Sequence, residues 1–311
     1  MNSFAGRRVL VTGGAGFIGS ALVHRLISGG ARVSVLDDFS TGRAEAVPAG
    51  GEVVRGSVTD QGTIRALVAE HQWVFHLAAR GIVASTRNPL EDFETNIGGT
   101  LNLLMAAREH RLERLVYVSS ASIYGNPRTL PINEDDGVMA LSPYAVSKHS
   151  GEQYCLAFYE SYGVRTTIVR YSNVYGPGQR PDNPYAGVVA KFFDAAVAGA
   201  PMAIHGDGQQ TRDFTFIDDA VDATLVVGMH PRAEGEVFNV GTGIETSVLD
   251  LARAIARTVG VDPVVEHIDR RDIDNIRRRV VNIEKIRRML HWSPQTALEP
   301  GLRRTARLLA S

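Results

Sequence analysis

The feature that most constrains this chain is a glycine-rich turn between an apolar strand pattern and a helical pattern near its start. Gly13, Gly16 and Gly19 follow the apolar run at residues 9–12. Glycine permits the positive φ of a tight turn, and without a Cβ its backbone can approach a phosphate. The N–H groups that open the following helix point at such a phosphate. The strand before, the helix after and an acidic residue downstream favour a dinucleotide-binding turn over a glycine turn that binds nothing.

The chain has 311 residues, 44% of them hydrophobic, which suits one large α/β domain or two lobes that share an interface. Its net charge of −1 gives no general attraction to nucleic acid or to an anionic membrane. Cys155 is the only cysteine, so no disulfide can form within the chain, as in a reduced cytoplasmic protein. We expect no signal peptide, because the first strand pattern begins near Arg8, and no spanning helix, because no apolar run reaches ~20 residues.

Apolar runs of strand length alternate with helical patterns, which predicts βαβ units in a doubly wound parallel sheet. The expected strands lie at 8–12, 32–37, 51–55, 73–78, 114–119 and 165–171, and the expected helices near 17–29, 60–70, 90–110 and 144–162.

After residue 171 the pattern changes, and residues 173–184 have the proline and glycine content of a loop. Further helices are expected near 185–199, 218–229, 246–259 and 282–290, and short strands at 202–205, 213–217 and 236–240. We therefore predict a dinucleotide-binding domain over 1–172 and a smaller α/β lobe over 173–311, with segments near 212–245 able to return to the first domain. The basic run at 270–279 is interleaved with acids and lacks aromatics, so a solvated face or a small phosphate site is favoured over nucleic-acid contact.

Asp37 ends the second expected strand, 18 residues after Gly19. An acid at about this distance accepts hydrogen bonds from the adenosine ribose and repels a 2′-phosphate, which favours NAD over NADP. The alternative is an ordinary turn aspartate, since residues 37–42 have turn composition.

Tyr144 and Lys148 are four residues apart at the start of an expected helix, with Ser142 as a candidate N-cap and Pro143 in the first turn. Their side chains therefore share one helix face. Tyrosine has a pKa near 10, so a base at pH 7 needs about 4 kcal/mol of help. One ammonium at about 4 Å supplies ~4 kcal/mol at an effective dielectric constant of 20. The pair can therefore act as a base in the cofactor cleft, or it is a helix-face contact with no chemistry.

Ser120 and Ser122 follow the fifth expected strand, at the sheet edge where a ligand lies in such folds. Their hydroxyls either bond a substrate oxygen or cap the strand end.

Together these motifs resemble the extended short-chain dehydrogenase/reductase family, in its NAD-dependent nucleotide-sugar epimerase/dehydratase branch. The likeness covers nearly the whole chain. It rests on the glycine triplet, Asp37, the run at 76–79, Ser120 and the Tyr144/Lys148 pair, followed by 170–176 and 206–214.

The resemblance implies a role for each matching residue. Tyr144 is the implied base, Lys148 lowers its pKa, and Ser120 shares the proton network. The implied cofactor residues are Gly13, Gly16, Phe17, Ile18, Gly19, Asp37, Asp38, Ser40, Thr41, Ser57, Val58, Leu77, Ala78, Ala79, Asn96, Tyr144, Lys148 and Tyr171. The implied substrate residues are Ser120, Ser122, Tyr144, Asn173, Arg180, Val188, Ala203, His205, Arg212, Arg271 and Asp274. No metal is implied.

The chain departs from the family pattern in three places. Ser57 stands where the family often has an aspartate that contacts the adenine. The loop after Ala79 is shorter than the family pattern by one residue, and the stretch from Asp274 to Asn282 is longer than the family pattern by one residue.

The residues at 120–122 indicate which reaction is available. Family 4,6-dehydratases carry Thr-Asp-Glu there and decarboxylases usually carry Thr-Ser-Glu, whereas this chain has Ser-Ala-Ser. Without an acid, elimination lacks its proton donor, and reversible oxidation at C4 of a UDP-hexose remains. The resemblance thus implies a 4-epimerase of the UDP-glucose/UDP-galactose type with tightly bound NAD.

Several alternatives stay open. Arg180 resembles a position of uronate-using relatives, so a UDP-glucuronate 4-epimerase is one of them, although a surface-loop arginine is favoured there. A nucleotide-sugar reductase or dehydratase is another, and a non-catalytic NAD sensor a third. The family also implies a cytoplasmic homodimer with helices near 100–110 and 144–162 at its interface.

Overall fold

The computed structural model describes residues 4–179, 187–270 and 275–309. Its first half consists of β1 (Arg8–Thr12), α1 (Phe17–Ser28), β2 (Arg32–Asp37), β3 (Gly51–Arg55), α2 (Gln61–Glu70), β4 (Trp73–His76), α3 (Ile82–Arg87), α4 (Pro89–Asp92), a π-helical turn (Phe93–Gly98), α5 (Gly99–His110), β5 (Arg114–Ser120), α6 (Pro143–Tyr162) and β6 (Thr166–Tyr171). Its second half consists of β7 (Asn173–Tyr175), α7 (Val188–Val197), β8 (Met202–His205), β9 (Thr211–Arg212), β10 (Phe214–Phe216), α8 (Ile217–Met229), β11 (Val237–Val240), β12 (Thr246–Ser247), α9 (Val248–Val259), β13 (Val265–Ile268), α10 (Glu284–Leu290) and α11 (Leu298–Leu309).

The main sheet is parallel and has seven strands in the order β11-β6-β5-β4-β1-β2-β3. The strand order reverses at β1, whose neighbours are β4 on one side and β2 on the other. Ligands of doubly wound sheets bind outside the carboxyl ends of the strands at such a reversal. The glycine turn begins at the carboxyl end of β1 and therefore lies at this point. The predicted fold class is confirmed.

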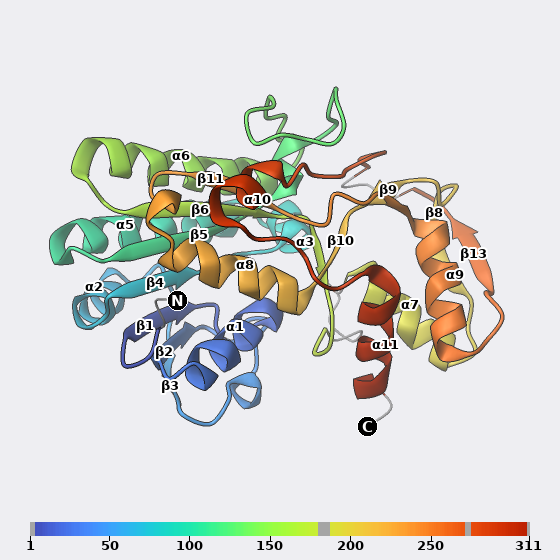
Figure 1. Ribbon diagram of the computed structural model, residues 1–311, viewed down its shortest axis with the longest axis horizontal. Coiled ribbons are helices and arrows are strands. Elements are labelled where there is room, and N and C mark those ends of the chain that lie inside the picture. The colour runs from blue at the N-terminus through green and yellow to red at the C-terminus, as the bar shows by residue number, and fades with distance from the viewer. Residues whose placement is uncertain (1–3, 180–186, 271–274, 310–311) are drawn as a thin grey trace.

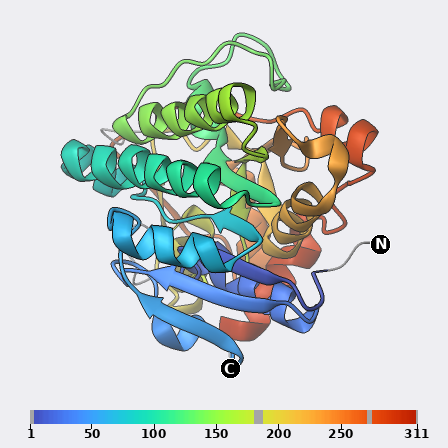
Figure 2. The same ribbon diagram turned by 90° about the vertical axis from the view of Figure 1, so that its left-hand side faces the viewer.

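Helices cover both faces of the sheet, which explains the continuous apolar runs of its strands. On one face α2, α5 and α6 lie side by side (Figure 2) and pack on Leu10, Val74 and Leu115. On the other face α1 packs against α8 (Figure 1), over a core that includes Val9 and Val11. Successive residues of β1 therefore pack into the hydrophobic cores on opposite faces of the sheet.

Helices α6 and α2 begin with a side-chain N-cap, and the first of these is the cap predicted at Ser142. Ser142 accepts a hydrogen bond from the Ala145 N–H at 3.2 Å, with Pro143 opening α6. Asp60 does the same for the Thr63 N–H at 3.2 Å at the start of α2.

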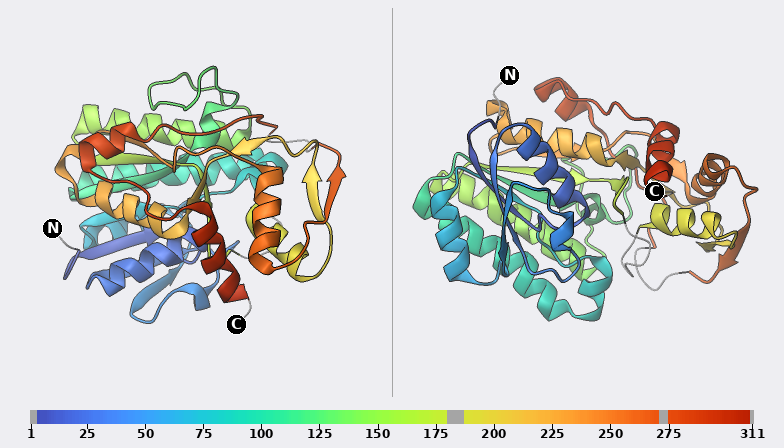
Figure 3. Two further views of the ribbon diagram at one scale, coloured as in Figure 1. Left: turned by 45° about the vertical axis from the view of Figure 1, so that its right-hand side comes forward. Right: turned by 90° about the horizontal axis from the view of Figure 1, so that it is seen from below.

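A smaller group of elements lies to one side of the sheet (Figure 3). It contains α7 and α9, which pack on each other, and β8 paired in parallel with β13. The chain enters this group after β7 and passes back through β10 and α8 to β11, which joins the main sheet beside β6.

Three sequence expectations were wrong. The single helix near 90–110 is instead α4, a π-helical turn and α5, preceded by α3. The stretch at 173–184 is not entirely loop, because β7 pairs in parallel with β10. The fourth strand ends at His76 rather than at residue 78. α11 was not expected at all.

Candidate active site

The turn between β1 and α1 is built on glycines that tolerate no side chain. Gly13 has φ +71°, and a Cβ there would lie 2.6 Å from the Ala78 nitrogen. A Cβ on Gly19 would lie 2.1 Å from the Gly13 carbonyl oxygen, so Gly19 allows α1 to pack on the turn. Gly16 caps α1 without a side-chain hydrogen bond. The N–H groups that open α1 at Phe17 and Ile18 thus remain available to an anion.

A cleft of about 530 Å³, counting the part open to solvent, lies beside this turn. It brings together eleven of the residues expected at the cofactor, and adds four that were not expected. The expected ones are Gly13, Gly16, Asp37, Asp38, Ser40, Thr41, Ser57, Val58, Leu77, Ala78 and Ala79. The additional ones are Leu36, Gly56, Arg80 and Thr95. A cleft lined in this way at a glycine turn suits a dinucleotide.

Asp37 lies at the end of β2 with its carboxylate held by backbone N–H groups. Ala15 N–H donates to it at 3.0 Å and Phe39 N–H at 2.8 Å. Burial raises the pKa of Asp37, and these two hydrogen bonds oppose the rise. The carboxylate is therefore fixed by the backbone at the cleft.

His76 of β4 forms side-chain hydrogen bonds with the neighbouring strand β1 and with α5. Its Nδ1 lies 2.7 Å from the Thr12 hydroxyl and its Nε2 lies 3.0 Å from the Thr100 hydroxyl. Burial, with a smaller effect from Lys148, lowers the pKa of His76 to about 3. A neutral His76 thus joins β1, β4 and α5 under the glycine turn.

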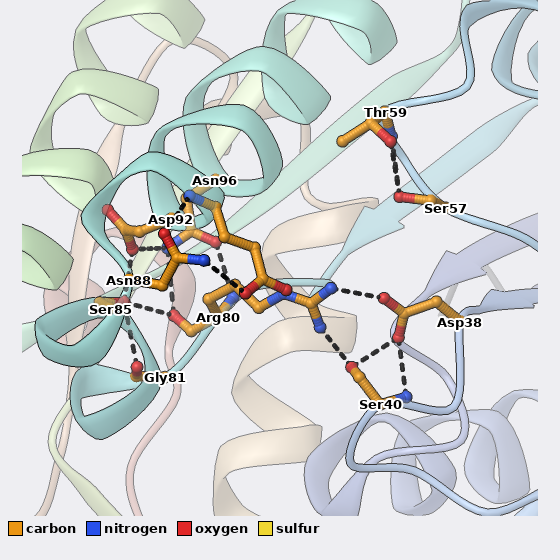
Figure 4. Close-up of polar contacts among 11 residues, drawn as sticks. Asp38, Ser40, Ser57, Thr59, Arg80, Gly81, Ser85, Asn88, Asp92 and Asn96 are labelled. Carbon is orange, nitrogen blue, oxygen red and sulfur yellow. Dashed lines mark hydrogen bonds and ion pairs between the residues drawn. The ribbon is translucent and has the colours of Figure 1, made fainter.

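Asn96 is buried in the π-helical turn and belongs to a polar network rather than to the cleft lining. Its side-chain oxygen accepts from Arg80 N–H at 2.7 Å, and its amide nitrogen donates to Arg80 O at 3.1 Å. The same nitrogen donates to Asp92 at 2.6 Å and Ser147 at 3.0 Å. Figure 4 shows how these contacts tie the loop after β4 to the helices behind it.

Tyr144 lies in the first turn of α6, near Ser120 at the end of β5, whose hydroxyl acts to lower the pKa of Tyr144. Ser120 also accepts from Ser122 N–H at 3.2 Å. The Ser122 hydroxyl is buried and has no hydrogen-bond partner among the residues that the structure describes. A polar atom of this kind at the end of a strand suits a bound ligand.

Lys148 follows Tyr144 by one helical turn but donates to the Val118 carbonyl at 2.8 Å, with its ammonium 4.8 Å from the centre of the Tyr117 ring. Burial lowers the pKa of Lys148 to about 8, and Asp92 and Glu152 oppose this. Burial raises the pKa of Tyr144 to about 12, and Ser120 and the buried Arg279 oppose the rise. The Lys148 ammonium is thus directed to a carbonyl of β5 rather than to the Tyr144 hydroxyl.

Lys148→Met should change how stability depends on pH. In the folded protein Lys148 loses its proton near pH 8, whereas the unfolded chain keeps it up to about pH 10.5. Between these values the unfolded state binds more protons, so rising pH stabilises the wild type by an amount on the order of 3 kcal/mol. Urea unfolding at pH 7, 8.5 and 10 should therefore show the stability of the variant relative to wild type falling with pH. A pH-independent difference contradicts the burial of a charged lysine.

The remaining expected residues are distributed over other elements. Asn173 opens β7, and Tyr171 directs its hydroxyl to Thr224 of α8, which leaves only its backbone for the cofactor. Arg212 is buried in β9 and donates to the Thr211 and Ile276 carbonyls, each at 2.8 Å. Val188 opens α7, Ala203 is exposed on β8, and His205 donates to the Asp269 carbonyl at 2.7 Å. The expected residues Arg180, Arg271 and Asp274 lie outside the described residues.

Gly13→Ala is expected to weaken NAD binding at least tenfold, equivalent to about 1.4 kcal/mol, because the methyl group meets Ala78 and φ is positive. Gly81→Ala is the matched control, since a Cβ there meets nothing within 4 Å and its φ is −77°. Calorimetric titration with NAD measures both. Equal affinities for the two variants would show that the turn does not hold the cofactor.

The fold and the cleft define a dinucleotide-binding α/β protein of the Rossmann type. The family model described as "NAD dependent epimerase/dehydratase family" matches residues 9–241, and the chain belongs to this family. No helix among the described residues is long and apolar enough to cross a membrane. No group of three or more His, Cys, Asp or Glu side chains in the described part could hold a metal ion.

Similar proteins include two curated relatives and a solved structure. The UDP-glucose 4-epimerase of Mycolicibacterium smegmatis is 41% identical over 307 residues, covering 96% of this chain and 97% of the relative. The UDP-N-acetyl-alpha-D-glucosaminuronate decarboxylase of Bacillus cytotoxicus is 35% identical, covering 96% of each. The crystal structure of UDP-glucose 4-epimerase with UDP-glucose from Thermotoga maritima superposes with a TM-score of 0.94 at 35% identity, covering 97% of this chain and 98% of that one.

Proposed function

We propose that this protein is an NAD-dependent 4-epimerase of a UDP-hexose of the UDP-glucose/UDP-galactose type, which acts through a transient 4-keto sugar. The observation that carries the proposal is that Tyr144, in the first turn of α6, lies near Ser120 at the carboxyl end of β5, where the serine hydroxyl acts on the pKa of the phenol. Residues 120–122 supply no acid for elimination. The 41% identity with a UDP-glucose 4-epimerase also supports it.

In this mechanism Tyr144, as the phenolate, takes the proton of the sugar 4-hydroxyl while the C4–H bond breaks. NAD, when bound, supplies the acceptor for that hydride and then its donor. The 4-keto sugar turns over in the pocket, and after hydride returns to its other face Tyr144 gives the proton back. No net oxidation occurs, so the cofactor has no need to leave.

The phenolate needs help from positive charge, since burial raises the pKa of Tyr144 to about 12. Relative to pH 7 this is a deficit of about 7 kcal/mol. Arg279 already opposes the rise, and Lys148 supplies a second positive charge one helical turn away. In the proposal Ser120 relays the proton between the sugar 4-oxygen and the Tyr144 phenol oxygen, from the sugar in the first half of the reaction and back to it in the second.

The other expected residues complete the proposed site. We assign the cleft around Gly13 and Asp37 to tightly bound NAD, with Asn96 holding the backbone of Arg80 beside it. Asn173 and Arg212 are assigned to the substrate diphosphate, and Ala203 and His205 to the nucleobase. The two proposed units are residues 1–172 for the cofactor and 173–311 for the nucleotide sugar.

A cytoplasmic homodimer is part of the proposal. Its interface lies on α5 and α6, where Met105, Val146, Tyr154 and Tyr162 expose apolar surface. Contiguous exposed apolar side chains are typical of protein–protein contacts.

A panel of UDP-sugars tests the proposal. The protein is incubated separately with UDP-glucose, UDP-galactose, UDP-glucuronate and UDP-N-acetylglucosamine, without added NADH, and the products are identified by chromatography and mass. Interconversion of UDP-glucose and UDP-galactose is expected. A C4-inverted uronate would instead favour the UDP-glucuronate 4-epimerase. Product only after NADH is added would indicate a reductase, and loss of water or of CO₂ would indicate a dehydratase or a decarboxylase. If the protein binds NAD but forms no product from any of the sugars, the result would indicate a non-catalytic NAD sensor.

A further inference from the structure

The loop after β4 reaches across the cofactor cleft through one side chain, Arg80. Its guanidinium donates to Asp38 at 2.9 Å through Nη2 and to the Ser40 hydroxyl through Nη1. Asp38 and Ser40 belong to the loop after β2. The Arg80 side chain is only 17% exposed and that of Asp38 31% exposed, so this contact is better shielded than an ordinary surface ion pair.

The strand order places the Arg80 contact across the carboxyl end of β1. β1 lies between β4 and β2, so a bridge from Arg80 to the Asp38–Ser40 loop passes the carboxyl end of β1, where the glycine turn begins. All these residues line the same cleft. A dinucleotide with its adenosine at Asp37 and its nicotinamide near Tyr144 has to run along this edge from β2 towards β5. It therefore has to pass the bridge.

The base of the bridge is firmly held (Figure 4). The backbone of Arg80 makes two hydrogen bonds with Asn96, at 2.7 and 3.1 Å, and its carbonyl accepts from Ser85 at 3.2 Å. The Arg80 Nε lies 2.8 Å from Glu91. Asn96 and Ser85 both donate to the buried Asp92, as does Ser147, the residue before Lys148. The loop after β4 is thereby tied to α6.

The far end of the bridge is also ordered. Asp38 accepts from the Ser40 N–H at 2.9 Å and from the Ser40 hydroxyl at 2.6 Å. Burial raises the pKa of Asp38, but hydrogen bonds from Ser40 and the Arg80 charge outweigh it and hold the pKa below its ordinary value. Asp38 therefore stays ionised and paired with Arg80 at neutral pH.

We propose that Arg80 is a cofactor-retaining residue, whose bridge to Asp38 and Ser40 closes the cleft over NAD and must open before NAD can leave. The proposal rests on the proposed function only in its use of NAD. An enzyme that returns its hydride to the same substrate has no need of cofactor exchange, so a closed bridge costs it nothing in turnover.

The test is the rate at which bound NAD exchanges with isotope-labelled NAD in solution, followed by mass spectrometry of the purified holoprotein. Arg80→Met, which keeps the aliphatic stem, is expected to exchange at least tenfold faster than wild type. Arg87→Met is the matched control, since Arg87 is an exposed arginine on α3, and its exchange should equal that of wild type.

A double-mutant cycle separates the bridge from two independent contacts with NAD. Ser40→Ala, which leaves the ion pair with Asp38, should speed exchange less than Arg80→Met, and the double variant should be little faster than Arg80→Met alone, because both changes act on the same bridge. If the exchange rate of the double variant equals the product of the two single-variant fold-changes, the two residues act independently and the bridge is overturned. An Arg80→Met rate within twofold of wild type would also overturn it, as would a wild type that exchanges NAD as fast as this variant. Normal retention of NAD in a protein that converts no UDP-hexose would overturn the proposed function alone.

Discussion

Tyr144→Phe is expected to lower turnover by about 10²–10⁴-fold, the usual contribution of a general acid–base group. The phenylalanine ring keeps the packing of α6 on β5 but cannot exchange a proton with Ser120 or with a sugar hydroxyl. NAD affinity should be unchanged within a fewfold, because the phenol oxygen is not part of the glycine turn. Initial rates with the sugar identified by the panel, together with NAD titration of the variant, measure the two effects separately.

Tyr154→Phe is the matched control for that experiment. Tyr154 lies on the same helix, is 39% exposed, and should tolerate the loss of its hydroxyl without a change in rate. A Tyr144→Phe protein as active as this control would remove the mechanism proposed above. The family and the fold would stand, and Ser120 or Lys148 would have to carry the proton instead.

Glu152→Ala is expected to lower the free energy of unfolding by about 3–5 kcal/mol, the usual cost of leaving one member of a buried ion pair unpaired. Glu152 is 0% exposed and holds Arg170 of β6 through two contacts, at 3.0 and 2.8 Å. Removing the carboxylate leaves the guanidinium buried with the Tyr124 hydroxyl and the Glu134 carbonyl, each at 2.7 Å, as its remaining hydrogen-bond partners among the described residues. Urea unfolding at pH 7 measures the loss.

Two further variants make this result interpretable. Glu299→Ala breaks the Arg257–Glu299 pair, whose side chains are 63% and 60% exposed, and should change stability little. Glu152→Leu combined with Arg170→Met removes both buried charges and should recover most of the lost stability. If Glu152→Ala is as mild as Glu299→Ala, the pair does not hold α6 against β6.

The sheet could be predicted well from the sequence because its buried strands are continuous apolar runs, which can be recognised one strand at a time. Residues 9–11 are apolar on both sides since both faces of β1 are covered, and the same holds for the strand at 33–36. The glycine turn and Asp37 were predictable because their roles depend on backbone geometry next to a strand end. A cap residue such as Ser142 acts within one helical turn, which is why it too could be predicted from the local sequence.

The elements that were missed depend on distant contacts. Pro300 and Gly301 look like a turn, yet Pro300 lies in the first turn of α11, and Gly301 lets the Tyr175 hydroxyl approach, since a Cβ would lie 2.1 Å from it. β7 becomes a strand only by pairing with β10, about forty residues further on. Asn88 and Pro89 end α3 and open α4, and within 90–110 the division is the π-helical turn Phe93–Gly98, around which the backbone stays helical.

In the candidate site too, residues with a local sequence pattern were predicted and contacts between distant elements were not. Tyr144 and Lys148 were found by their spacing, but the direction of the Lys148 ammonium depends on the Val118 carbonyl of another element. Arg80 gave no local signal beyond the short loop after Ala79, because its partners belong to the loop after β2. Arg279 likewise approaches Tyr144 from the last quarter of the chain.

The position of β11 has a consequence for how the chain is made. This strand closes one side of the main sheet next to β6, yet about 65 residues separate the two in sequence. While the protein emerges from the ribosome, β6 has an open edge until residue 240 is available. Sheet edges of this kind are the sites at which nascent chains aggregate. Truncation before residue 237 should therefore yield an insoluble product, although every residue of the glycine turn and of the Tyr144/Lys148 pair is still present.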